Sequence, residues 1–105
     1  MPIVYFIQPA ELVGTDRYKI GRSSKNDLSR MKGYKIGSRY LSIMECEDDV
    51  KVEKVLIATF NSNYEKVAGN EYFRGDEEDM LNVFVKTVRQ QKNDQVEVIA
   101  PVTGG

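Results

Sequence analysis

Val4-Tyr5-Phe6-Ile7 and Tyr18-Lys19-Ile20-Gly21-Arg22-Ser23 are the two stretches that decide the fold of this chain. The first is apolar and aromatic, which is typical of a buried strand over residues 3–7. In the second, apolar and charged side chains alternate over residues 17–22, which predicts another strand. Gly14-Thr15-Asp16 supplies turn residues between them. The two strands are therefore predicted to pair as an antiparallel hairpin.

The remaining sequence predicts helices packed on this hairpin, with one more main strand. The expected elements are a short helix from Ser23–Asn26 to about Lys32, a strand over 39–45, a helix over 47–61, a loop over 61–70, a short strand or extended arm over 71–74, a helix over 76–91 and an edge strand over 95–99. We expect an α+β fold in which a small antiparallel three-stranded sheet is flanked by helices. Residues 1–94 are predicted to form a single domain, and 95–105 a C-terminal edge strand or flexible tail.

Length and composition narrow the class of protein. The chain has 105 residues, enough for one modest core. It has no apolar run long enough to span a membrane, and its first residues lead directly into a strand, so we expect no signal peptide. A single cysteine, Cys46, suits a reducing compartment. We therefore expect an intracellular protein that is not secreted, in the host cytoplasm or nucleus if it is viral.

The absence of histidine excludes several kinds of active site. Imidazole bases, Ser-His and Cys-His nucleophile pairs and zinc-finger sites all need that side chain.

Charge is unevenly distributed along the chain. Residues 1–42 have eight basic and three acidic side chains, whereas residues 43–105 have seven basic and thirteen acidic ones. A basic segment of this kind can bind phosphates, although a solvated charged surface is the alternative interpretation. A dedicated tight DNA-binding protein is usually more basic overall. The side chains that we expect to contact nucleic acid are Lys19, Arg22, Lys25, Lys32 and Lys35.

Four side chains suggest phosphodiester chemistry. Tyr5 and Tyr18 can meet across the hairpin, Arg30 follows within reach, and Glu53 could supply a metal ligand. Each also has an ordinary structural interpretation, because strand tyrosines are usually half-buried and helix arginines and glutamates are usually solvated. A nuclease is the first hypothesis that uses all four.

The residues and their order resemble the GIY-YIG nuclease superfamily, most closely its branch in phages and large DNA viruses. Val4-Tyr5 is similar to the first motif, without its leading glycine, and Tyr18-Lys19-Ile20-Gly21-Arg22 is similar to the second. The family's helix arginine falls on Arg30 and its helix glutamate on Glu53. Glu71-Tyr72-Phe73 resembles a further family segment, so the likeness covers roughly residues 3–90.

The resemblance implies a mechanism. Glu53 would hold one Mg²⁺ or Mn²⁺ ion, and Arg30 would clamp the phosphate oxygens. Tyr18 or Tyr5 would orient or deprotonate the attacking water, and the products would be a 5′-phosphate and a 3′-hydroxyl. Many members have a histidine four residues after the arginine, where this chain has Tyr34. The Tyr34 phenol could take a similar hydrogen-bonding place, so Tyr34 is also a candidate catalytic residue.

Two other functions stay open. The same fold could bind nucleic acid without cutting it, which the missing histidine and the acidic second half favour. It could instead be a viral protein-interaction module, with Tyr64, Tyr72 and the acids at 76–79 as contact surface. For the leading hypothesis, the partner is DNA, no membrane is involved, and a homodimer or a larger complex would supply substrate recognition.

Overall fold

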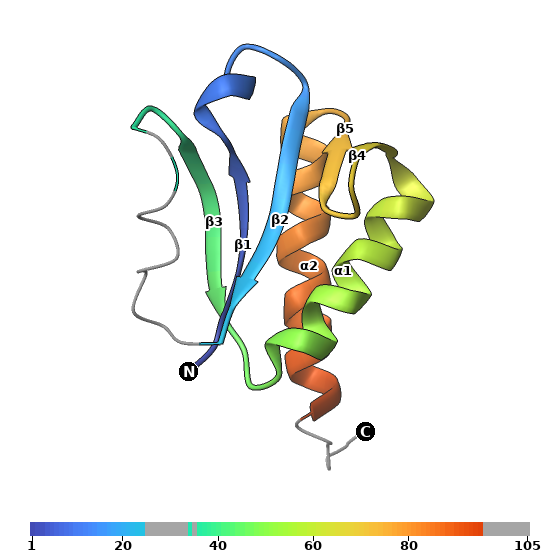
Figure 1. The fold of residues 1–105 in the computed structure, drawn as a ribbon. Helices are drawn as coiled ribbons and strands as arrows, with labels where there is room; N and C mark the ends of the chain where they lie inside the picture. Colours follow the sequence, from blue (N-terminus) through green and yellow to red (C-terminus); the bar gives the residue numbers. More distant parts are fainter. Residues whose placement is uncertain (25–33, 35, 96–105) are drawn as a thin grey trace.

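The computed structural model describes residues 1–24, 34 and 36–95, and for 93–95 it describes the backbone alone. Its elements are strands and helices that form a sheet with both α-helices on one side (Figure 1). In order they are β1 (Ile3–Gln8), the 3₁₀ turn η1 (Ala10–Leu12), β2 (Arg17–Ser23), β3 (Arg39–Glu45), α1 (Asp49–Asn63), β4 (Glu65–Ala68), β5 (Tyr72–Arg74) and α2 (Glu77–Gln95). All five strands belong to one antiparallel sheet with the order β3-β1-β2-β5-β4.

The predicted α+β class is confirmed, but the sheet has five strands instead of three. The hairpin of β1 and β2 and the strand at 39–45 are where the sequence places them. The extended arm is β5, and the expected loop over 61–70 contains β4, which pairs with β5. The predicted short helix falls outside the described residues beyond Ser24, and the predicted edge strand falls outside them beyond Gln95.

Both helices begin at acidic caps. The Asp48 side chain accepts a hydrogen bond from the backbone N–H of Lys51 at 3.1 Å, and Asp76 accepts one from the N–H of Asp79 at 2.9 Å. These carboxylates satisfy backbone donors that a helix leaves without partners in its first turn, and they complement its positive end. The two helix starts predicted from the acids at 47–49 and 76–79 are thereby explained.

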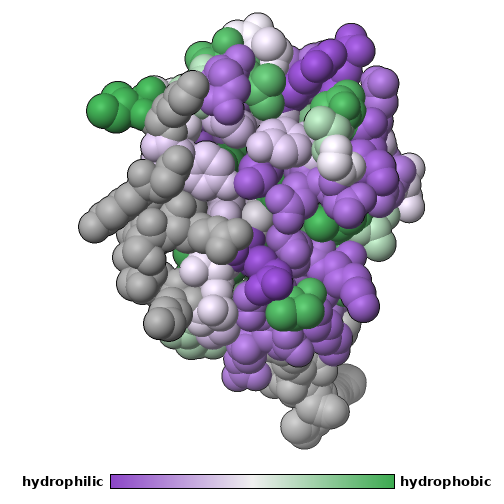
Figure 2. Space-filling model, in the orientation of Figure 1, coloured by the Kyte–Doolittle hydropathy of each residue, from purple (hydrophilic) through white to green (hydrophobic). Residues whose placement is uncertain are grey.

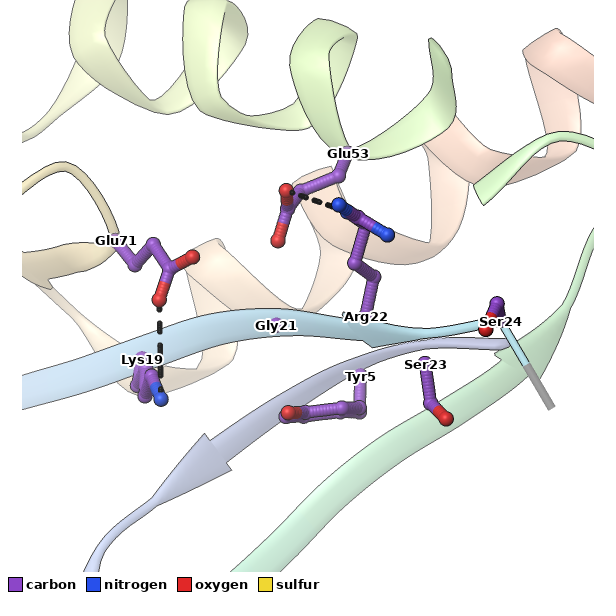
Figure 3. A pocket seen from close by; sticks show the side chains of 8 residues that line it. All are labelled: Tyr5, Lys19, Gly21, Arg22, Ser23, Ser24, Glu53 and Glu71. Carbon is purple, nitrogen blue, oxygen red and sulfur yellow. Dashed lines mark ion pairs between the residues drawn. The ribbon is translucent and has the colours of Figure 1, made fainter. Parts of the chain in front are cut away.

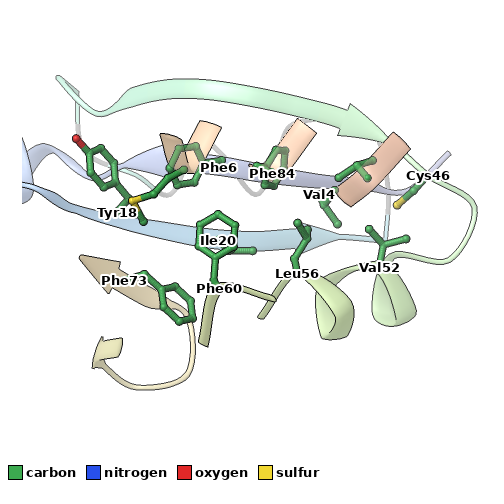
Figure 4. Packing of buried hydrophobic residues seen from close by; sticks show 12 residues of the cluster. Val4, Phe6, Tyr18, Ile20, Cys46, Val52, Leu56, Phe60, Phe73 and Phe84 are labelled. Carbon is green, nitrogen blue, oxygen red and sulfur yellow. The ribbon is translucent and has the colours of Figure 1, made fainter. Parts of the chain in front are cut away.

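One face of the sheet packs against α1 and α2 to form the main core (Figure 4). Phe6 lies at its centre, within aromatic contact distance of Tyr18, Phe60 and Phe84. The cluster consists of Val4, Phe6, Tyr18, Ile20, Cys46, Val52, Leu56, Phe60, Phe73, Met80, Phe84 and Val88. All of these side chains are buried, so the core fixes how α1 lies along β2.

The opposite face of β1 carries a smaller cluster. Ile3, Tyr5 and Ile7 are buried there, and Tyr34 packs against them. Since side chains alternate along a strand, this face and the main core use alternate residues of β1.

Figure 2 shows a largely hydrophilic surface with scattered apolar side chains on the viewed face. Among the described residues, no helix has the length and apolar character needed to cross a bilayer.

Candidate active site at the edge of β2

A polar pocket of about 180 Å³ lies beside β2, beyond the point where β5 stops pairing with it (Figure 3). β5 pairs with β2 only from Arg17 to Lys19, and the last backbone bond joins the Ile20 N–H to the Glu71 carbonyl at 3.0 Å. Beyond that bond, the rest of β2 pairs with β1 on one side and runs beside α1 on the other. The pocket is lined by Tyr5, Lys19, Gly21, Arg22, Ser23, Ser24, Glu53 and Glu71.

Glu53 reaches the pocket from α1 (Figure 3). Its side chain is only 15% exposed, and its Oε1 lies 3.3 Å from the Nε of Arg22. The pKa of Glu53 is raised, first because burial disfavours the charged carboxylate and next because Glu71 adds negative charge, while Arg22 opposes both effects. The nearby arginine therefore does not fully compensate the negative charge of this carboxylate.

Tyr5 reaches the same pocket from the other face of the sheet, because Gly21 has no side chain to block it. Tyr5 and Gly21 are paired across β1 and β2. A methyl group on Gly21 would lie 2.5 Å from the Tyr5 Oη and closer still to two carbon atoms of the ring. No real side chain tolerates such contacts, so the place of the Tyr5 phenol depends on glycine at this position.

Lys19 connects the phenols to the carboxylates. Its Nζ donates to the Tyr34 Oη at 2.7 Å and lies 3.7 Å from the Glu71 Oε1. The Tyr34 Oη is in turn 3.3 Å from the Tyr5 Oη. The Lys19 ammonium also lies over the Tyr34 and Tyr72 rings, at 5.0 and 5.6 Å from their centroids. A chain of polar contacts thus joins Glu71, Lys19, Tyr34 and Tyr5.

Tyr18 does not meet Tyr5, contrary to the prediction from the sequence. Pairing with Gly21 puts Tyr5 on the same face as Lys19, and the adjacent residue Tyr18 then lies on the core face. The Tyr18 hydroxyl donates to Glu77 at 3.0 Å. Desolvation, followed by that hydrogen bond, raises the pKa of Tyr18 to about 12. Tyr18 is therefore a core residue with a surface hydrogen bond, outside the pocket.

Lys19 was expected only to contact nucleic acid, but it lines the pocket and binds Tyr34. The signal that could have found it is strand alternation: if Gly21 leaves room for Tyr5, then Lys19, two residues before, shares that face. Arg22 was also expected to contact nucleic acid. It lines the pocket, but it pairs with two carboxylates of α1, Asp49 and Glu53.

The other expected site residues lie beyond the part of the chain that the structure describes. They are Arg30, Lys25, Lys32 and Lys35.

The pocket contains donors that suit a hard divalent cation. In the described ranges, no group of three or more histidine, cysteine, aspartate or glutamate side chains is arranged as a metal cage. Mg²⁺, however, is often held by one or two carboxylates together with water and substrate phosphate. Glu53 provides one such carboxylate, which is 15% exposed and points into the pocket, and Glu71 lines the same space. The residues present therefore fit a cation of this type.

Comparison with known proteins identifies the family. The protein-family model for the T5orf172 domain matches residues 2–89 of the sequence, which include every described residue of the pocket. No curated protein and no solved structure matches the chain. The T5orf172 domain is linked to nuclease-type phage proteins and suggests a nuclease-like or DNA-binding module. The chain thus belongs to the T5orf172 domain family.

Proposed function

We propose that this chain is a metal-dependent endonuclease domain of GIY-YIG type that hydrolyses phosphodiester bonds in DNA at the β2 edge pocket. The observation that carries the proposal is the meeting of Tyr5 and Glu53 in one polar pocket although they come from opposite sides of the sheet. Phenol, ammonium, guanidinium and carboxylate groups then surround a space large enough for a phosphate group.

In this proposal Glu53 holds one Mg²⁺ or Mn²⁺ ion. Burial first, and then the negative charge of Glu71, raises the pKa of its carboxyl group, so a bound cation would favour the charged carboxylate. When bound, the ion would supply positive charge at the scissile phosphate and at the leaving oxygen. Lys19, 17% exposed and hydrogen-bonded to Tyr34, adds a fixed positive charge on the phenol side of the pocket.

Tyr5 is the residue that we assign to the attacking water. Its side chain is 1% exposed and lines the pocket, with its hydroxyl beside Gly21, so it can hold a water molecule in a fixed orientation. The Lys19 ammonium donates a hydrogen bond to the Tyr34 oxygen, and the Tyr34 hydroxyl contacts the Tyr5 hydroxyl, so both phenols are held in place. In this way Tyr34 takes the place that histidine has in many related nucleases. Arg30 would clamp the non-bridging oxygens, as the resemblance implies.

Plasmid nicking with a matched pair of tyrosine variants tests the proposal. Tyr5→Phe should lower the nicking rate in Mg²⁺ by about 10²-fold or more, because it removes the group that handles water. Tyr18→Phe removes the same atom from the other face and should stay within about threefold of the parent. Glu53→Gln and Arg30→Ala should each lower the rate as strongly as Tyr5→Phe.

Two results would reject this function. One is a parent chain that nicks DNA in neither Mg²⁺ nor Mn²⁺. The other is a Glu53→Gln variant as active as the parent. Rates should be compared well below the melting temperature of each variant, because Tyr18→Phe loses a hydrogen bond worth about 1 kcal/mol.

A second candidate is a nucleic-acid-binding module that does not cut. The observation that favours it is the Arg22–Glu53 ion pair, which occupies one oxygen of the proposed metal ligand. Binding of DNA that weakens with salt, without cleavage in any divalent metal, would support this function instead.

A further inference from the structure

The two carboxylates that contact Arg22 have different surroundings. Asp49 and Glu53 are four residues apart on α1, so their side chains share the face that meets β2. The Arg22 Nη1 donates to the Asp49 Oδ2 at 2.8 Å, whereas the Arg22 Nε lies 3.3 Å from the Glu53 Oε1. The Asp49 side chain is 9% exposed and the Arg22 side chain 39% exposed. The shorter and more buried contact is therefore the one with Asp49.

This geometry divides the guanidinium between two acceptors. Charge-assisted hydrogen bonds weaken with distance, so the 2.8 Å contact holds Arg22 more strongly than the 3.3 Å contact does. Without a partner on the Asp49 side, the arginine could turn its planar fork fully onto Glu53, because guanidinium and carboxylate form bidentate pairs. A cation and such a bidentate arginine would compete for the same two oxygens.

We propose that Asp49 is a positioning residue, which draws the Arg22 guanidinium aside and so keeps the Glu53 carboxylate available to a divalent cation. The inference rests on the proposed function, since it concerns how Glu53 is kept ready for its metal. Arg22 is then more than a strand–helix ion pair. Its position at the pocket wall is set by Asp49, a buried acid that lies one helical turn before Glu53 on α1.

Direct measurement of Mn²⁺ binding by calorimetry tests the inference without reference to cleavage. In Asp49→Asn the released Arg22 closes on Glu53, and Mn²⁺ affinity should fall by about threefold or more. Arg22→Gln removes the competitor, so its affinity should equal or exceed that of the parent. In the double variant Asp49→Asn with Arg22→Gln, the loss should disappear, because no arginine remains to close on Glu53.

The double-mutant cycle separates positioning from simple loss of negative charge. If Asp49 acted only through its charge, Asp49→Asn would weaken Mn²⁺ binding equally with and without Arg22. The matched control is Asp48→Asn, which removes the same charge from the adjacent residue and keeps a good helix cap. Its affinity should stay near that of the parent. Asp49→Ser is a second variant if Asn at that position prevents cooperative folding.

The outcomes distinguish this inference from the proposed function. If the parent does not bind Mn²⁺, or if Glu53→Gln binds it equally well, the metal site itself is wrong and the inference fails with it. If the parent binds Mn²⁺ through Glu53 but Asp49→Asn behaves like Asp48→Asn, or its loss persists without Arg22, the inference alone is overturned. A loss of Mn²⁺ affinity in Asp49→Asn that disappears when Arg22 is also replaced by Gln would support it.

Discussion

Gly21→Ala is the sharpest test of how the pocket is built. The added methyl group would lie 2.5 Å from the Tyr5 Oη and closer to the ring carbons, whereas ordinary contacts begin near 3.4 Å. The Tyr5 ring must therefore move by about 1 Å or more, although it is buried against Ile3 and Ile7. Overpacking of this kind costs about 1–3 kcal/mol of unfolding free energy. A displacement of about 1 Å at a catalytic group can lower the rate by about 10²-fold.

The assay combines thermal melting with plasmid nicking in two backgrounds. Gly21→Ala should lower the melting temperature by roughly 5–15 °C and nicking by about 10²-fold. In a Tyr5→Phe background the loss of stability should persist, because the ring remains, but nicking should fall little further. A Gly21→Ala variant with parental activity would refute the reasoning. An equal further loss of activity in both backgrounds would also refute it, since Gly21 would then act apart from Tyr5.

Two further predictions concern stability. Leu56→Ala should lower the free energy of unfolding by about 2–5 kcal/mol in urea titration, because Leu56 is fully buried in the main core, and a cost near zero would contradict the packing described. Glu77→Gln should make the protein lose less stability as the pH falls. The hydrogen bond from Arg39 first, and then the one from Tyr18, holds the pKa of Glu77 below its usual value. The charged Glu77 therefore stabilises the fold above its unfolded pKa, and this stabilisation is lost as the pH falls through its folded pKa. The difference between Glu77→Gln and the parent should be small, because this group is half-exposed. It is measured as the fall in melting temperature between about pH 6 and about pH 3, with Glu78→Gln as the control.

Elements with a strong local pattern could be predicted from the sequence. β3 has the predicted bounds, 39–45, and α1 and α2 begin within two residues of the predicted positions because acidic caps mark their starts. β4 could not be predicted in this way. Its four residues have little apolar alternation, and they form a strand because β5 offers backbone partners. Such pairing depends on tertiary structure, which a local pattern does not contain.

The candidate site could be predicted only in part, because its residues meet through strand register. Glu53 and Tyr5 were named from the sequence and line one pocket, whereas Tyr18 was placed there wrongly. A shift of one residue in a strand moves a side chain to the other face, and the hairpin sequence does not fix that register by itself. The close fit of Tyr5 on Gly21 does fix it, and it brings Lys19 to the pocket.

The pocket depends on a strand that ends early. β5 has three residues and leaves the last part of β2 beside α1, where a longer strand would have covered the edge. Exposed sheet edges are usually protected because their backbone groups invite pairing with other chains. Here a phenol from one face and a carboxylate from the other line the same pocket at this edge, and Gly21 leaves room for the phenol. Because that meeting needs both the short β5 and the missing side chain, extending β5 or substituting Gly21 should remove the site while leaving the main core intact.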